Sequence, residues 1–94
     1  MTKPLYTSAA SEDLTDILNL ISRDKPAGAL AWVDKIEAKC LWIADNPSIG
    51  EQQPHLGEGV RASVVGRYVI IHRKANDRVE ILRVIPGDRN ITRL

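Results

Sequence analysis

The sequence predicts an α+β fold with the order strand, two helices and three strands, in which an antiparallel sheet packs against a helical hairpin on one face. Three observations predict it. Apolar residues recur at helical spacing up to about residue 45. A stretch rich in glycine and proline follows, from Pro47 to Gly59, and reads as a loop. Beyond that stretch, three runs rich in β-branched residues have the composition of strands.

The first strand and the first helix occupy the N-terminal quarter of the chain. Residues 3–7 (KPLYT) can form a short strand, which Pro4 restricts to a sheet edge or a strand start. Ser8 or Ser11 offers an N-cap for the helix that follows. The helix has one apolar stripe at i, i+3, i+4 and i+7, formed by Leu14, Ile17, Leu18 and Ile21. We therefore expect one face of this helix to pack on the core.

A second helix follows after a very short connection. Asp24 can cap it, and Pro26 is tolerated in its first turn. Its apolar stripe alternates steps of four and three residues through Ala29, Val33, Ile36, Cys40 and Ile43. Residues 46–47 (Asn-Pro) end it near Asp45. Because so few residues join the two helices, they should form an antiparallel hairpin.

The C-terminal part of the chain predicts a meander of three strands. The strand-like runs are Val60–Val65, Tyr68–Lys74 and Val79–Ile85, separated by short turns at residues 66–67 and 75–78. Runs joined by such short turns pair as antiparallel neighbours, so these three strands should form most of the sheet.

Arg83 stands out in the last of these strands. Simple alternation sets it on the face of Ile81 and Ile85, where an arginine is costly unless it is paired or opens onto a groove. In one interpretation it forms an ion pair with Glu80, Asp88 or another carboxylate. In the other it belongs to a cationic patch on the sheet face that the helices leave open. The patch would consist of Arg61, Arg67, Arg83 and Arg89.

The composition fits one small domain over residues 1–94, with a modest core. The net charge of +1 excludes a strongly basic nucleic-acid coat. The charge is uneven, however: residues 1–50 carry five basic and seven acidic side chains, and residues 51–94 carry eight basic and five acidic ones. The later basic residues are all arginines except Lys74, and arginine suits bidentate contact with carboxylate or phosphate.

Several site classes are not expected. Cys40 is the only cysteine and lies on the apolar stripe, so it should be a buried structural residue in a reducing compartment. No apolar run approaches the ~18 residues of a membrane span, and no signal pattern opens the chain, so we expect a cytoplasmic protein. His55 and His72 stand alone, and no glycine-rich phosphate loop exists, so neither a metal nor a cofactor is expected.

The arginines are better equipped for binding than for catalysis. RNA cleavage through the 2′-hydroxyl would need an acid and a base beside the cations. The candidates are His72, Tyr68, Glu80 and Asp88. His72 and Tyr68 share a face of one strand, where packing or pairing accounts for them better than catalysis does.

Four segments of the chain, in this order, resemble the ParE branch of the RelE/ParE toxin–antitoxin superfamily. They are residues 41–50 (LWIADNPSIG), 59–61 (GVR), 66–70 (GRYVI) and 79–84 (VEILRV). Each segment is weak alone, but the set in this order is fairly specific, and the similarity covers roughly residues 3–90.

The resemblance implies a function. It implies a bacterial toxin of a type II system, associated with plasmid stabilisation and neutralised by a smaller ParD-like antitoxin encoded beside it. ParE proteins are known for inhibiting DNA gyrase, whereas RelE proteins cut messenger RNA on the ribosome. The tail, residues 90–94, lacks the aromatic or histidine that RelE enzymes typically keep there, which favours gyrase inhibition by binding. The alternatives are a ribosome-dependent endoribonuclease and a non-toxic relative that only binds antitoxin.

The resemblance also implies roles for particular residues. The arginines that match the family pattern are those of the expected patch, with Tyr68 beside them, and they are the expected target-binding residues. Trp32 and Trp42 lie off the central stripe of the second helix, so they either extend the core or line a groove for a partner. We expect them to anchor the antitoxin, and we expect neither a membrane nor a nucleic acid as a direct partner. His72 and Pro86 depart from the family pattern, as does the segment 87–90.

Overall fold

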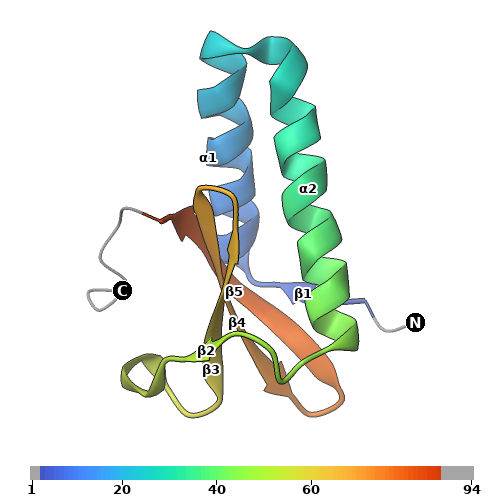
Figure 1. Ribbon diagram of the computed structural model, residues 1–94, viewed down its shortest axis with the longest axis vertical. Coiled ribbons are helices and arrows are strands. Elements are labelled where there is room, and N and C mark those ends of the chain that lie inside the picture. The colour runs from blue at the N-terminus through green and yellow to red at the C-terminus, as the bar shows by residue number, and fades with distance from the viewer. Residues whose placement is uncertain (1–2, 88–94) are drawn as a thin grey trace.

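The computed structural model describes residues 3–87, which form two long helices and a five-stranded sheet (Figure 1). The helices are α1 (Ser8–Asp24) and α2 (Pro26–Asp45). The strands are β1 (Leu5–Tyr6), β2 (Glu51–Gln52), β3 (Val60–Val65), β4 (Tyr68–Ala75) and β5 (Arg78–Pro86). Their order across the sheet is β1-β5-β4-β3-β2. The predicted helical hairpin and meander are both present, and the hairpin tip extends well beyond the sheet (Figure 1).

Neither helix is capped by the residue expected from the sequence. Thr7, and neither Ser8 nor Ser11, caps α1: its hydroxyl oxygen accepts the N–H of Ala10 at 3.1 Å. The same hydroxyl donates to the carbonyl of Leu82 in β5 at 2.8 Å, so Thr7 joins the helix start to the sheet as well. Lys25 separates the two helices, and it precedes α2 without a side-chain cap.

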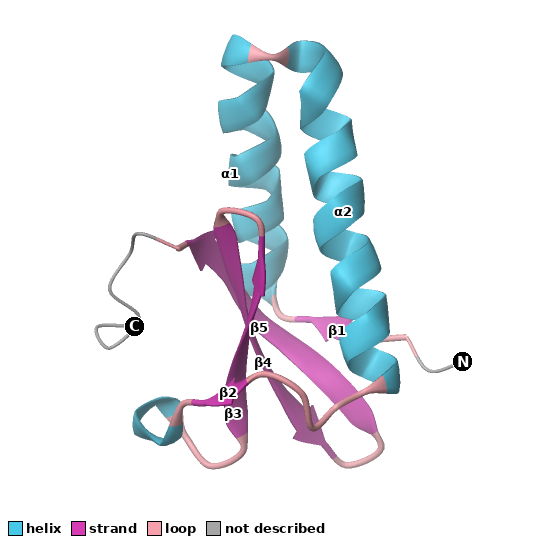
Figure 2. Cartoon of the chain, in the orientation of Figure 1, coloured by secondary structure: helices cyan, strands magenta, loops and turns pink. Residues whose placement is uncertain are grey.

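The sheet is mixed. The predicted antiparallel pairing holds for β3, β4 and β5, whereas β1 lies parallel to β5 at the edge, with Leu5 opposite Glu80. The stretch predicted as a loop also contains structure: β2 pairs with β3, and a short 3-10 helix spans Pro54–Leu56 (Figure 2). Neither helix in residues 3–87 is long and apolar enough to cross a membrane.

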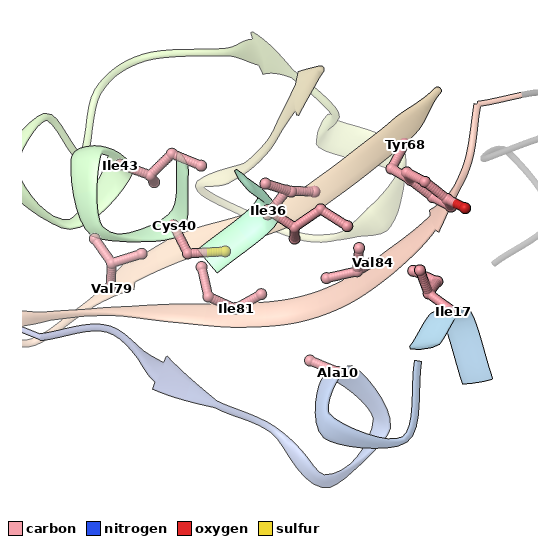
Figure 3. Packing of buried hydrophobic residues seen from close by; sticks show 10 residues of the cluster. Ala10, Ile17, Ile36, Cys40, Ile43, Tyr68, Val79, Ile81 and Val84 are labelled. Carbon is pink, nitrogen blue, oxygen red and sulfur yellow. The ribbon is translucent and has the colours of Figure 1, made fainter. Parts of the chain in front are cut away.

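The core lies between the helical hairpin and one face of the sheet (Figure 3). The fully buried side chains at its centre are Ala10 from α1, Ile36, Cys40 and Ile43 from α2, and Ile70 and Ile81 from the sheet. Each fully buried isoleucine contributes about 1.5–3 kcal/mol. Cys40 is buried as predicted, and its burial raises the pKa of its thiol to about 11.

A β-bulge changes which residues of β5 face the core. His72 lies opposite Ile81, but the preceding Ile71 lies opposite Arg83, so Leu82 is an extra residue in the ladder. Ile81 and Val84 consequently both face the helices. The expectation that Arg83 shares a face with Ile81 is wrong, because simple alternation fails at the bulge.

Candidate binding surface

Arg61 lies at the start of β3, on the face that the helices cover. It is opposite His72, which is fully buried under α2 together with its neighbours in the core. The expectation that Arg61 points to the open face of the sheet is therefore wrong. Its guanidinium donates from Nη1 to the carbonyl oxygen of Gly50 at 3.0 Å, so it holds the chain that follows α2.

Arg83 has a carboxylate partner in the first helix. Its Nε and Nη2 donate to Oδ2 and Oδ1 of Asp13 at 2.7 and 3.0 Å, a bidentate ion pair. Asp13 Oδ2 also accepts the backbone N–H of Val84 at 2.9 Å. These hydrogen bonds raise the pKa of Arg83 above its usual value. The ion-pair interpretation is therefore confirmed, with Asp13 as the carboxylate. Glu80 pairs with Arg73 instead, and Asp88 lies outside the described residues.

The four arginines do not form one patch within the described residues. Arg67 lies in the turn between β3 and β4, at the opposite end of β3 from Arg61, and its side chain is exposed. Arg89 lies outside residues 3–87. Arg67 is thus the exposed member of the expected set, while Arg61 and Arg83 are held by contacts inside the molecule.

Arg67 borders a groove between α1 and the sheet. Three hollows, of about 410, 680 and 210 Å³, all include Leu20 and Tyr68 in their walls. Arg67 lines the two larger ones, and Pro86 lines two of the three. We call this the Leu20 groove. Leu20 itself is 57% exposed.

Trp32 closes one end of the Leu20 groove. Its ring meets that of Tyr68 edge to face, with centroids 5.8 Å apart, and it packs against the core. The ring also lies over Gly66, where an added Cβ would come within 2.4 Å of it. Trp32 therefore extends the core, and its ring also lines the Leu20 groove.

Trp42 is a surface residue near the end of α2. Its side chain is 49% exposed, and the ammonium of Lys39 lies 4.3 Å from its ring centroid. Leu30 and Leu41, also on α2, are 65% and 42% exposed. A helix with apolar groups on its outer face as well as its inner one offers contact area to a partner.

Two of the candidate acids and bases, His72 and Tyr68, are poorly placed for chemistry on a substrate. His72 is completely buried, and its Nε2 lies 2.8 Å from the hydroxyl of Ser63. Burial, with help from Arg61 and Lys39, lowers the pKa of His72 to about 4. Tyr68 is 7% exposed. Within the described part of the chain, no three His, Cys, Asp or Glu side chains gather as metal ligands would.

Two residues of this surface escaped sequence reasoning. Leu20 is an apolar residue outside the stripe of Leu14, Ile17, Leu18 and Ile21, and its position off the stripe was the available signal. Asp13 looks like an ordinary acidic residue near the start of a helix, and nothing near it in the sequence indicates a partner 70 positions away.

The described residues thus combine an exposed groove, an arginine beside it without an ion-pair partner among residues 3–87, and a buried histidine and tyrosine. The sequence matches the family described as the ParE toxin of the type II toxin–antitoxin system parDE over residues 5–91, and the chain belongs to that family.

The fold has a solved counterpart. The chromosomal ParDE toxin–antitoxin system from P. aeruginosa superposes with a TM-score of 0.76 and 24% identity, covering 94% of this chain and 98% of that one. At that identity the likeness concerns the fold. No curated protein matches this chain.

Proposed function

We propose that this chain is a toxin that inhibits DNA gyrase by binding it, in the bacterial cytoplasm where gyrase acts. Membership of the ParE family supports the toxin class. The burial of His72 supports binding over RNA cleavage, because a fully buried imidazole with a pKa near 4 cannot reach a ribose hydroxyl.

Arg67 is the arginine from which we would begin to map the target contact. It is exposed, and no carboxylate of residues 3–87 lies within ion-pair distance of it. Arg61 and Arg83 already donate to Gly50 and Asp13, so each has fewer N–H groups left for a target than Arg67 has. Arg89 remains a proposed contact on the strength of the family resemblance.

Supercoiling by purified gyrase tests the proposal. We expect the chain, freed of antitoxin, to block supercoiling, and Arg67→Glu to weaken the block about tenfold, the equivalent of one lost charge-assisted contact of about 1.4 kcal/mol. The matched control is Arg78→Glu, an exposed arginine at the far turn of the sheet, which should leave the block unchanged. Uninhibited supercoiling at large molar excess of folded chain would remove gyrase as the target.

Two other outcomes would point elsewhere. Codon-linked cuts in messenger RNA, seen by primer extension after induction, would indicate the ribosome-dependent endoribonuclease. Healthy growth during strong expression of intact, folded chain would indicate a relative that only binds antitoxin.

We also propose that a ParD-like antitoxin neutralises the chain and uses Trp32 and Trp42 as anchors. Trp42 gives the cleaner test because it is half exposed, whereas Trp32 also supports the core. We expect Trp42→Ala to lower affinity for the antitoxin encoded beside this chain by about 30-fold, the ~2 kcal/mol of an aromatic hot spot. Isothermal titration measures it, with Val64→Ala, at an exposed apolar residue of β3, as the control. Unchanged affinity for the Trp42 variant would exclude that anchor.

A further inference from the structure

The outer flank of α1 carries an apolar side chain between opposite charges. Asp16, Leu20 and Arg23 are spaced four and three residues apart, so they lie along one face of the helix, and all three are exposed. Neither Asp16 nor Arg23 forms an ion pair within residues 3–87. Leu20 sits near the midpoint between the two charges.

This flank is also hollowed. Leu20 forms a wall of the Leu20 groove, whose largest hollow, of about 680 Å³, is bounded on the other side by Tyr68 and Pro86. The flank therefore presents a projecting leucine and, beside it, a hollow large enough to admit side chains of another molecule. A surface with both a projection and a hollow can pair with a copy of itself about a two-fold axis.

The sheet edge beneath the groove is closed to strand addition. The N–H of Val84 is taken by Asp13, and Pro86, two residues further along β5, has no N–H to donate. A partner at this flank must therefore pack side chains against α1 instead of extending the sheet.

We propose that two copies of this chain associate through this flank, with their α1 helices antiparallel and Leu20 of each copy in the Leu20 groove of the other. The charges specify this occupant and its direction. A two-fold axis between residues 19 and 20 sets Asp16 of each copy against Arg23 of the other, so the interface contains two Asp16–Arg23 pairs. Parallel helices would place like charges together. The association concerns the free chain and does not depend on which target the toxin binds.

Sedimentation of the purified chain, freed of antitoxin, over a range of concentrations tests the proposal. We expect a reversible dimer for the natural sequence and a monomer for Leu20→Lys. The matched control, Leu30→Lys, changes a leucine on α2 that is at least as exposed, and this variant should still dimerise. Circular dichroism confirms that each variant is folded.

Charge-reversal variants test the predicted direction of the helices. Asp16→Lys and Arg23→Glu should each weaken the dimer several-fold, because each leaves like charges facing across the axis. The double variant, Asp16→Lys with Arg23→Glu, restores both pairs and should recover the natural affinity. A chain that stays monomeric at all concentrations, a Leu20→Lys variant that still dimerises, or a double variant weaker than either single one would each overturn the proposal. A monomeric chain whose Leu20→Lys variant loses antitoxin binding would assign the groove to the antitoxin.

Discussion

His72 shows at the scale of one residue how the core constrains charge. Its Nδ1 has no hydrogen-bond partner among residues 3–87, while its Nε2 faces the Ser63 hydroxyl. The arrangement in which Nε2–H donates to Ser63 leaves only a lone pair unpaired at Nδ1, which costs less than an unpaired buried N–H. The charged groups near the ring, Arg61 and Lys39, are both cations. The folded protein therefore holds His72 neutral.

This predicts an acid-sensitive stability. The pKa of His72 is lower in the folded chain, about 4, than in the unfolded chain, 6.5. Its contribution is therefore complete above pH 6.5 and is lost as the pH falls towards 4, with a limit on the order of 3 kcal/mol. Denaturant unfolding of the natural chain and His72→Gln at pH 7 and pH 4.5 measures it. The natural chain should lose more stability than His72→Gln, and His55→Gln, at an exposed histidine, should behave like the natural chain. Equal losses in all three would contradict the account.

At the scale of elements, residues at the start of α1 bond to the β5 edge beyond the point where β1 ends. β1 pairs with β5 only at Glu80 and Ile81, and the next groups of the β5 edge bond to Thr7 and Asp13. The Thr7 N–H donates to the Ile81 carbonyl, and its hydroxyl donates to that of Leu82. Helix and strand are thus joined by the hydrogen bonds that a longer β1 would otherwise make.

The Asp13 contact should dominate that junction. Replacing Asp13 by alanine leaves the Val84 N–H and the Arg83 guanidinium without partners, at a cost of about 3 kcal/mol. Asp16→Ala, one turn further at an exposed site, should cost less than about 0.5 kcal/mol. Thermal or urea unfolding gives both values.

Arg83→Ala separates the two roles considered for this arginine. If Arg83 is structural, the variant loses stability, and a double-mutant cycle with Asp13→Ala shows strong coupling. Toxicity lost at unchanged stability would instead place Arg83 in the target contact.

At the scale of the whole molecule, local patterns predicted most of the fold. The type and order of the elements followed from the apolar stripes of α1 and α2 and from the three C-terminal runs. These patterns depend only on the periodicity within one element. The bulge at Ile71 and His72 was not predictable, because it depends on how two strands pair. The same holds for β2, two residues whose strand character comes from β3.

The surface was harder to predict than the fold. Arg61 and Arg83 look alike in the sequence, yet one is held by Gly50 and the other by Asp13, both distant in the chain. Trp32 and Trp42 look equivalent on α2, but only Trp32 meets Tyr68. Contacts between distant segments decide which of these side chains remain available for partners.

The central claim, that this ParE-family chain acts on gyrase, is tested most directly by inducing it without antitoxin in bacteria. Incorporation of labelled thymidine and labelled methionine is followed over the first minutes. We expect DNA synthesis to fall first while translation continues. A collapse of translation before DNA synthesis would contradict the claim and point to the ribosome.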